Sequence, residues 1–539
     1  MNTATRGFWI LLGVLWLASL PLRPLFDPDE GRYAEIPREM AASGDWATPT
    51  LNGLKYLEKP PLQYWATAAL YGAFGVHEWT ARLWAAALAF LCIPLVYFFT
   101  RRIGVPTDTA LIAASLLAIN PYFALTGQLN LLDQGFTFFL SGAVFSFVIA
   151  QREFSQPLQL RRWMLVTWAC LALAVLSKGI VTLVLAGLSL ITYVAITRDL
   201  SLLRRLQPAP GLPLFLAIAL PWFWVVQSRN PEFLQFFFIR EHFERFLTTV
   251  HNRVEPFWYF IPIVAVSLLP VIGNWRHWTL AGIEGTRAPT GFRAELFLLI
   301  WCAVVVVLFS VSQSKLSSYV MPIMPALAAV LARVTQAQPA AYPRAKWASI
   351  GLMMLCAAGL VIAGWKRQGS MSTPSLSWAI IVVSICVIYL FFDRIRRQQP
   401  VAQRWLALAA VSISGYQLLG LCYSASFPAR SAAGLASEFA GTISIDTNLY
   451  SVGQFRHSLA FYLRRPLAVY DYVGELEFGP RPAHGSIADG SREQFLEQWQ
   501  KETNALAFIE PRIFGALSAA GMSGRVVARD ARSIVVARS

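Results

Sequence analysis

Long apolar stretches recur along the chain and predict helices that cross a membrane. A helix needs roughly 17–25 mostly apolar residues to span the hydrocarbon core of a bilayer. Thirteen segments meet this requirement, at residues 8–25, 80–100, 108–126, 134–151, 163–177, 179–197, 211–227, 257–274, 294–312, 319–335, 347–365, 376–393 and 404–424. The pattern therefore predicts an all-α membrane protein, a polytopic helical bundle of about 13 transmembrane helices.

Basic residues in the short loops predict the orientation of these spans. If the N-terminal segment with Arg6 lies inside, every second loop is rich in Arg and Lys, as the positive-inside rule requires. These residues are Arg101, Arg102, Arg152, Arg161, Arg162, Arg198, Arg204, Arg205, Arg276, Arg287, Arg293, Arg333, Arg344, Lys346, Arg394, Arg396, Arg397 and Arg404. The short loops on the opposite, trans side carry few basic residues. A multi-pass membrane protein of defined orientation follows.

Composition supports a lipid environment and changes the meaning of the net charge. The chain is 56% hydrophobic and 14% charged, whereas soluble domains have about 45–50% apolar and about 25% charged residues. A net charge of +15 would ordinarily suggest nucleic acid, but much of it lies in the inside loops and reports topology. We therefore expect membrane lipids, and no nucleic acid, as partners. The six cysteines lie in apolar spans, which favours a packing role.

Three polar segments share the trans side and define the predicted domains. They are the loops 26–79 and 228–256 and the tail that follows residue 425. In the tail, short apolar runs alternate with helical patterns, which predicts a small soluble α/β domain. We therefore predict a transmembrane domain at residues 1–425, which includes both loops, and an α/β domain at residues 426–539.

The first trans loop carries a concentration of acids directly after a membrane span. Asp29 and Glu30 should lie at the bilayer surface, where a lipid-linked head group would sit. An alternative is that Asp29 only caps a short helix at residues 30–35, whose N-terminus favours carboxylates. Pro37 predicts an early end to that helix, which leaves the placement of Arg38 and Glu39 open.

Further along this loop, Glu58 and Lys59 precede two prolines and an amphipathic interfacial segment at residues 62–74. Lys59 either faces a phosphate or extends its ammonium toward the interface as a snorkelling lysine. Asp133 stands at the trans end of the fourth span, where a carboxylate is costly and is by default a functional candidate. Capping of the following helix is the alternative. Lys178 stands alone between two apolar spans and suits phosphate contact and surface placement equally.

The second trans loop is locally basic, which suits phosphates of a donor or an acceptor. Its basic residues are Arg240, His242, Arg245, His251 and Arg253. Glu241, Glu244 and Glu255 are available to pair with part of this set. His242 beside Glu241 leaves a divalent metal open, although the spacing matches no recognisable metal motif.

Several motifs together resemble a known superfamily. In order after the first span stand DEGRYAEIPREM, SGDW and YLEKPPLQYW, followed at residues 236–263 by FFFIREHFERFLTTVHNRVEPFWYFIPI. SKLSSY at residues 314–319, with Pro322, completes the set. This order resembles the protein O-mannosyltransferase-like superfamily of C-type glycosyltransferases, and within it the branch of 4-amino-4-deoxy-L-arabinose lipid A transferases. The DE and EKP motifs occur in many relatives with other substrates, so they specify the superfamily better than the acceptor.

The resemblance implies an inverting glycosyltransferase of the bacterial inner membrane, with its active site facing the periplasm. Its donor would be an undecaprenyl-phosphate sugar and its acceptor a lipid A phosphate, a modification linked to polymyxin resistance. No covalently bound cofactor is expected. It implies catalytic roles for Asp29, Glu30 and Asp133, and donor-phosphate binding by Lys59, Arg245 and Tyr319. Additional candidates are Arg32, Glu58, Lys178, His242 and Lys315.

Two alternatives remain open from the residues alone. One is transfer of another sugar, such as mannose or a hexosamine, to protein, hopanoid or glycan. The other is a transporter of lipid-linked sugars, but transporters usually show internal repeats and charges near the bilayer centre. Here the charges gather in the trans loops. Asp29 would act as a general base toward a hydroxyl acceptor and would orient the donor if the acceptor is already an anionic phosphate.

Overall fold

The computed structural model describes residues 3–538 apart from 154, 245–254, 273–290, 339, 369–371, 440–442 and 473–487. The contacts divide the chain into two compact units. Residues 1–20, 58–63 and 83–426 form the membrane unit, and residues 21–57, 64–82 and 427–539 form the loop–tail unit. Much of the first trans loop, which we predicted as part of the transmembrane domain, therefore groups with the tail. The predicted domain boundary at residue 425 stays a prediction.

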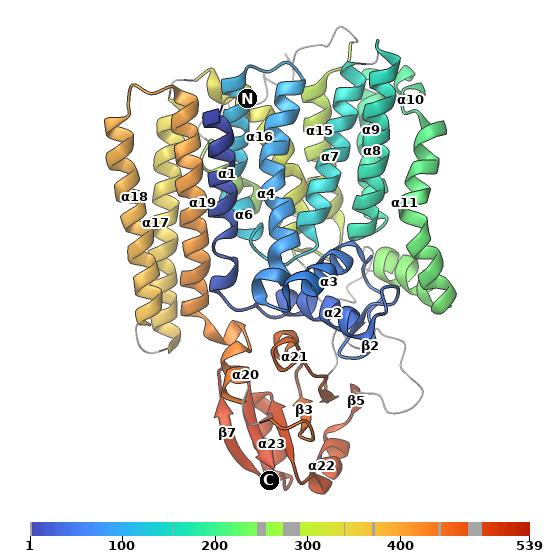
Figure 1. Cartoon of the computed structure of the whole chain (residues 1–539), viewed down its shortest axis with the longest axis vertical. Coiled ribbons are helices and arrows are strands. Elements are labelled where there is room, and N and C mark those ends of the chain that lie inside the picture. Colours follow the sequence, from blue (N-terminus) through green and yellow to red (C-terminus); the bar gives the residue numbers. More distant parts are fainter. Residues whose placement is uncertain are drawn as a thin grey trace. The chain divides into compact units, whose positions relative to one another are not determined.

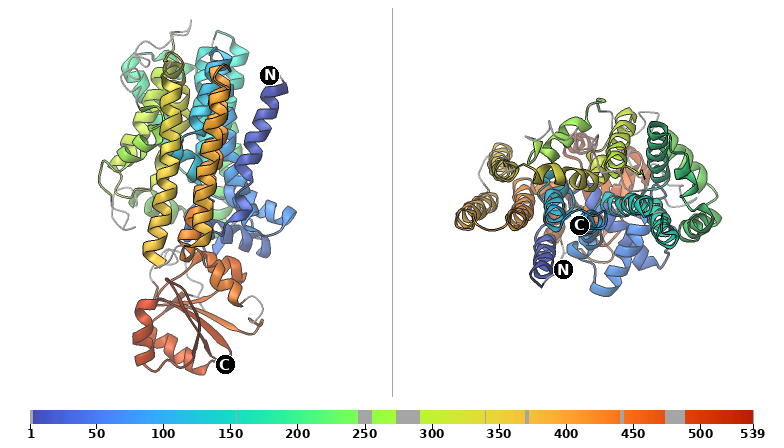
Figure 2. Two further views of the ribbon diagram at one scale, coloured as in Figure 1. Left: turned by 90° about the vertical axis from the view of Figure 1, so that its left-hand side faces the viewer. Right: turned by 90° about the horizontal axis from the view of Figure 1, so that it is seen from above.

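Long apolar helices build the membrane unit. Among the described residues, nine helices are long and apolar enough to cross a membrane. They are α4 (Glu78–Arg102), α7 (Asp133–Arg152), α8 (Pro157–Lys178), α11 (Pro208–Arg229), α15 (Ala294–Val311), η4 with α16 (Ser317–Ile323 and Met324–Gln336), α17 (Ala341–Gln368), α18 (Thr373–Ile395) and α19 (Val401–Ser426). Figures 1 and 2 show them side by side, with their axes in similar directions. The predicted helical membrane bundle is confirmed.

Shorter apolar helices account for three further predicted spans. They occupy Gly7–Leu22, which contains most of α1 (Thr3–Leu17), as well as α5 (Thr107–Ala118) and α9 (Val181–Thr197). The predicted span 108–126 is interrupted because Asn120 caps a separate helix, α6 (Pro121–Thr126), by accepting a hydrogen bond from the amide of Phe123.

The predicted span at 257–274 is the exception among the thirteen. Its helix, α13 (Phe260–Leu268), has nine residues, which is too short to cross a bilayer alone. The structure does not describe residues 273–290, which follow it. Two short elements complete the unit, α10 (Ser201–Arg204) and the π-helix η2 (Gln235–Glu244).

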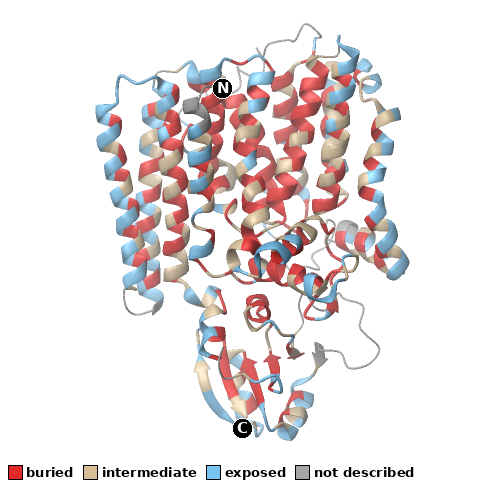
Figure 3. Cartoon of the chain, viewed as in Figure 1, coloured by how far each residue is buried: buried red, intermediate tan, exposed pale blue. Residues whose placement is uncertain are grey.

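Burial distinguishes a central helix from peripheral ones. Of the most apolar 18-residue stretch in each helix, 89% is buried in α7, against 28% in α11 and in α18. Figure 3 shows the same contrast, with α7 mostly buried and α18 exposed along much of its length. Because α7 packs against α8 and η4, its first residue, Asp133, lies inside the bundle.

In the loop–tail unit, α2 (Asp29–Ser43) follows the first acidic motif directly. Our prediction that Pro37 ends this helix early is wrong. Pro37 removes only its own amide from the hydrogen-bond ladder, and the turn around it is fixed by other bonds. Arg38 donates to the Glu35 carboxylate at 2.6 Å, and the Tyr71 hydroxyl donates to the Ala34 carbonyl at 3.1 Å. A small hairpin of β1 (Thr50–Leu51) and β2 (Leu54–Lys55), then α3 (Leu62–Phe74), follow.

The tail folds into the predicted α/β arrangement. Its six-stranded sheet has the order β5-β4-β3-β6-β8-β7, in which β5, β4, β3 and β6 are parallel. The strands are β3 (Asn448–Val452), β4 (Ala468–Tyr470), β5 (Ala488–Gly490), β6 (Ala505–Ile509), β7 (Arg525–Arg529) and β8 (Ile534–Arg538). The helices are α20 (Ala433–Phe439), α21 (His457–Leu463), α22 (Arg492–Lys501) and α23 (Pro511–Ala519). The helices α22 and α23 cover one face of the sheet and bury Trp499 and Leu517 against it.

Candidate active site

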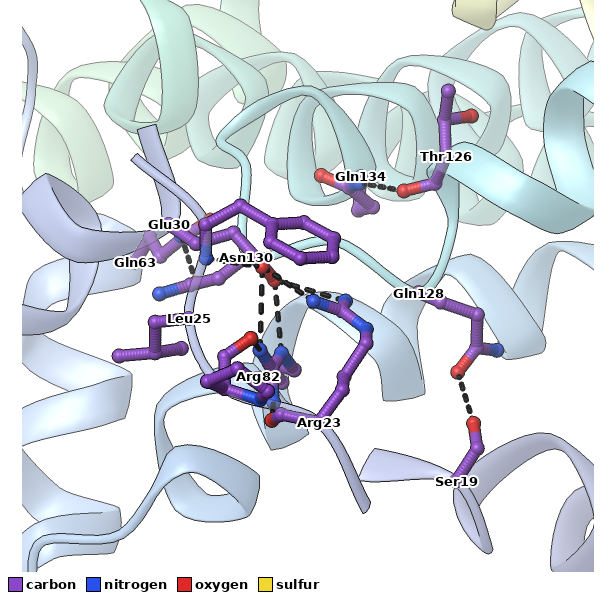
Figure 4. A network of polar contacts seen from close by, with 12 residues as sticks. Ser19, Arg23, Leu25, Glu30, Gln63, Arg82, Thr126, Gln128, Asn130 and Gln134 are labelled. Carbon is purple, nitrogen blue, oxygen red and sulfur yellow. Dashed lines mark hydrogen bonds and ion pairs between the residues drawn. The ribbon is translucent and has the colours of Figure 1, made fainter. Parts of the chain in front are cut away.

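Glu30 lies in a fully paired ion cluster. Arg23 donates to both carboxylate oxygens at 2.5 and 3.0 Å, and Arg82 donates to both at 2.8 and 3.2 Å. The amide of Phe26 adds a bond of 3.0 Å. All three charged side chains are at most 6% exposed, and Figure 4 shows both guanidinium groups directed at the carboxylate. Glu30, predicted as catalytic, has its two oxygens occupied by the protein itself.

The electrostatics of this cluster favour an ionised Glu30. Burial opposes ionisation, but the charges and hydrogen bonds of Arg23 and Arg82 outweigh it and hold the pKa of Glu30 well below its ordinary value of 4.5. Breaking a buried pair costs about 3–5 kcal/mol because it leaves an uncompensated charge. The cluster therefore fixes the start of α2.

Asp29 differs sharply from its neighbour. Its side chain is 40% exposed and pairs with Arg32, whose own side chain is 3% exposed. The Arg32 guanidinium also lies over the ring of Tyr33, 4.9 Å from the centroid. The predicted capping role is not observed, because Pro28 is the N-cap of α2 and no side chain makes a cap hydrogen bond. Asp29 thus presents a partly accessible carboxylate at a helix N-terminus, where the dipole favours negative charge.

The third acid of the motif is buried. Asp27 accepts hydrogen bonds from Arg456 at 3.2 Å and from the amide of Ser458 at 2.7 Å, and its side chain is 2% exposed. Among the three acids of residues 27–30, the DPDE motif, Asp29 is therefore the one whose carboxylate is accessible to a ligand.

Lys59 lies between two carboxylates of the membrane unit. Its ammonium is 3.8 Å from Glu58 and 3.6 Å from Glu241 of η2, and it donates to the Glu58 carbonyl at 3.1 Å. The first and second trans loops therefore meet at this lysine. Both of these neighbours are carboxylates, so further cations would favour a phosphate at Lys59.

Asp133, Lys178 and Tyr319 come together although they are far apart in the sequence. The Asp133 carboxylate, at the first residue of α7, pairs with the ammonium of Lys178 at the end of α8, and each side chain is 11% exposed. The same ammonium lies 4.5 Å from the centroid of the Tyr319 ring, a favourable cation–π geometry. Helix capping does not account for Asp133, because α7 has no side-chain cap hydrogen bond.

Lys315 is buried and bonded to the backbone. It is 5% exposed and donates to the carbonyl of Ser312 at 2.6 Å. Of the remaining candidates in the second loop, Arg245, His251 and Arg253 lie outside the described residues, as does the side chain of His242. In the part of the chain that the structure describes, no cluster of three or more His, Cys, Asp or Glu side chains could hold a metal ion.

Sequence reasoning missed the partners that hold these acids. Arg82 lies near the start of the predicted span 80–100, where a lone arginine is a signal for a buried partner. Arg456 gave no local signal. Gln63 and Asn130 also escaped notice, and their amides form a buried hydrogen bond of 2.9 Å that joins the EKPPLQ motif to the segment before Asp133 (Figure 4).

Protein-family models and solved structures match this chain. The family model of dolichyl-phosphate-mannose-protein mannosyltransferases matches residues 7–237, and that of the aminoarabinose transferase C-terminal domain matches residues 435–538. The crystal structure of ArnT from Cupriavidus metallidurans bound to undecaprenyl phosphate matches with a TM-score of 0.87 and 32% identity, and covers 99% of this chain and 97% of that one. The chain belongs to the ArnT family. The apo crystal structure of the same ArnT gives a TM-score of 0.86.

Curated proteins of the ArnT family agree. An undecaprenyl phosphate-alpha-4-amino-4-deoxy-L-arabinose arabinosyl transferase of Edwardsiella ictaluri is 31% identical over 373 residues, which are 67% of this chain and 66% of that protein. Transferase 1 of the same description from Sodalis glossinidius is 29% identical over 526 residues, 92% of this chain and 91% of that protein. The match thus spans just under two thirds of the first relative and nearly all of the second. Membership in the ArnT family makes this chain a polytopic membrane glycosyltransferase.

Proposed function

We propose that this chain transfers 4-amino-4-deoxy-L-arabinose from undecaprenyl phosphate to a phosphate of lipid A, on the periplasmic side of a bacterial inner membrane. The names of its relatives and the undecaprenyl phosphate bound to the Cupriavidus ArnT support the donor. The observation that carries the proposal is the contrast within the DPDE motif, where Asp29 alone combines a partly exposed carboxylate with a rigidly held backbone.

The reaction is a displacement at the anomeric carbon with inversion. The bond from that carbon to the donor phosphate oxygen breaks, and a bond to an acceptor phosphate oxygen forms. The leaving undecaprenyl phosphate carries away the electron pair. An anionic phosphate acceptor needs no general base, so Asp29 orients the amino sugar and stabilises positive charge as the oxocarbenium-like transition state develops. Asp133 supplies a second carboxylate whose position Lys178 fixes.

Cations and a hydrogen-bond donor stabilise the departing phosphate. Lys59 and Arg245 supply positive charge, and the Tyr319 hydroxyl donates a hydrogen bond. The Lys59 ammonium lies 3.6 and 3.8 Å from the two carboxylates, and its side chain is 15% exposed, so a donor phosphate can reach it. Glu58 and Glu241 then serve to hold the lysine before the donor arrives.

Purified protein tests the proposal directly. Undecaprenyl-phosphate aminoarabinose and lipid A are incubated with the protein, and lipid A is weighed by mass spectrometry. An aminoarabinose increment, with an anomeric configuration opposite to that of the donor by NMR, is expected. An increment of another sugar mass from a mixed donor pool, or modification of a protein, hopanoid or glycan, would replace the proposed substrates. Retained anomeric configuration would contradict inversion.

Impermeant thiol labelling tests the orientation. A cysteine in place of Ser43, which is exposed in the first trans loop, should react with an impermeant maleimide added to the periplasm. A cysteine in place of the exposed Arg397 should react only after the membrane is opened. Wild-type protein controls for its own six cysteines. The reverse pattern would contradict a periplasmic site.

A further inference from the structure

A buried arginine of the tail contacts the acidic motif within the loop–tail unit. Arg456 stands directly before α21 and is 1% exposed. Its guanidinium donates to Asp27 at 3.2 Å, to Asp530 at 2.6 Å and to the carbonyl of Ala429 at 3.1 Å. One side chain thus joins the motif, the segment that leads into the tail and the sheet domain.

The backbone of α2 also contacts the start of α21. A Cβ added at Gly31 would lie 2.3 Å from the amide nitrogen of Ser458, a distance that no real side chain tolerates. Glycine costs roughly 0.5–1 kcal/mol relative to alanine inside a helix, and this close approach explains its presence. The other oxygen of Asp27 accepts the same Ser458 amide at 2.7 Å. The first turn of α2 therefore rests directly on the tail.

Further contacts hold the loop on both sides of α2. Before the helix, the Tyr462 hydroxyl of α21 accepts a hydrogen bond of 2.8 Å from the amide of Leu25. After it, the side chain of Asn52 makes two bonds to the backbone of Leu467, at 2.9 and 2.8 Å. A loop held at both ends and at its centre has few conformations left to lose when the substrate binds.

From these contacts we infer that Arg456 is a positioning residue for Asp29, so that the C-terminal α/β domain is part of the catalytic apparatus. Asp29 lies two residues after Asp27 in the same turn, and Arg456 fixes that turn. The inference rests on the proposed function, because Asp29 matters only if it meets the sugar. It assigns to the tail a role in preorganising the acid, since small misplacements of a reacting group can lower rates by roughly 100-fold.

A matched set of variants tests this inference. Arg456→Gln and Asp27→Asn break the contact to the motif. Asp530→Asn is the control, because it breaks the other ion pair of the same arginine, within the tail, and leaves the contact to Asp27 in place. Arg456→Lys keeps the charge and serves as the conservative rescue and as a milder variant if Arg456→Gln does not fold.

We expect Arg456→Gln to lower kcat by roughly 10- to 100-fold with a donor KM within about threefold of wild type. The Asp530→Asn control should keep kcat within about threefold, and the double variant of Asp27 and Arg456 should be no worse than the worse single variant. Arg456→Lys should recover part of the rate. Equal losses of kcat in Arg456→Gln and Asp530→Asn, or an unchanged kcat in folded Arg456→Gln, would overturn the inference.

Hydrogen exchange gives a readout that does not depend on the reaction. Peptides covering residues 26–36 should exchange faster in Arg456→Gln and Arg456→Lys than in Asp530→Asn, with residues of α7 unchanged. If wild-type protein transfers no aminoarabinose but this exchange pattern holds, the proposed function fails and the contact stands. If transfer occurs and exchange of residues 26–36 is the same in all variants, the inference fails alone.

Discussion

Two charged clusters, one in each unit, differ in burial and in the length of their ion pairs. In the loop–tail unit, Glu30 accepts five hydrogen bonds from two arginines and one amide, at 2.5 to 3.2 Å and 2% exposure. In the membrane unit, Lys59 is 3.6 and 3.8 Å from its carboxylate partners and is 15% exposed. Both clusters contain residues of the same family-like motifs.

This difference distinguishes charged residues that hold the structure from those that can contact a substrate. A buried charge with all its bonds made by the protein has no capacity left for a substrate, and removing one partner is costly. A partly exposed charge is accessible to a charged ligand. By this criterion we propose that Asp29, at 40% exposure, and Lys59, at 15%, take part in the reaction, and that the buried Glu30 and Asp27 hold the loop. The variants below test this division, in order of expected effect on the rate of transfer.

Asp29→Asn should have the largest effect. It removes the partly exposed carboxylate with almost no change of shape, and we expect kcat to fall by about 1,000-fold, the upper end of the loss for one group that stabilises transition-state charge. Transfer to lipid A by purified protein is the measurement, with membrane insertion unchanged. Asp446→Asn, at an exposed acid of the same unit, is the matched control. Activity near wild type in Asp29→Asn would remove Asp29 from the mechanism.

Lys59→Ala should come next. Loss of one preorganised cation at the leaving phosphate should lower kcat/KM by about 100-fold, as for the loss of one oxyanion-hole donor. Initial rates over a range of donor concentrations measure it. Lys55→Ala, four residues earlier on β2, removes an equal charge and should stay within about threefold. If both variants lose activity equally, the effect is general electrostatics and not phosphate contact at Lys59.

Lys178→Met should lower kcat by about tenfold. It leaves Asp133 without its partner but keeps the volume beside the Tyr319 ring. If Lys178 acts by fixing Asp133, the double variant with Asp133→Asn should be no slower than Asp133→Asn alone, because coupled residues are not additive. Additive losses in this double-mutant cycle would show that the two residues act separately.

Glu30→Gln should change the rate least and the stability most. We expect kcat to fall by less than about tenfold, while unfolding of the loop–tail unit becomes easier by about 3–5 kcal/mol. Thermal unfolding in detergent measures the second effect. A large loss of rate with unchanged stability would show that Glu30 acts in catalysis and not in holding the structure.

The pH dependence of wild-type stability reports the same cluster. The pKa of folded Glu30 lies below its ordinary value of 4.5, so its contribution to stability is present above pH 4.5 and is lost as the pH falls through lower values. Glu30→Gln should lack this part of the acid sensitivity. Equal acid sensitivity in both proteins would assign it to other groups.

The sequence by itself determined the spans and the class of the tail. Hydropathy is a local property, so in the part of the chain that the structure describes twelve of the thirteen predicted spans contain an apolar helix of at least ten residues, nine long and three short. The alternation of apolar runs predicted β3, β4, β6 and β8. Local patterns also misled. The apolar run at residues 442–446 predicts a further strand, but its described residues 443–446 form none. No local pattern predicted the strands β5 and β7 or the helix α23.

Only the tertiary structure decided which acid is available for chemistry. Asp29 and Glu30 are adjacent and chemically alike, but successive residues of a helix point about 100° apart, so one faces the protein and the other does not. The partners that decide their roles come from distant parts of the chain, 52 residues away for Arg82 and Glu30 and 429 for Arg456 and Asp27. Burial and ion pairing depend on such long-range contacts, which no local pattern of residues encodes.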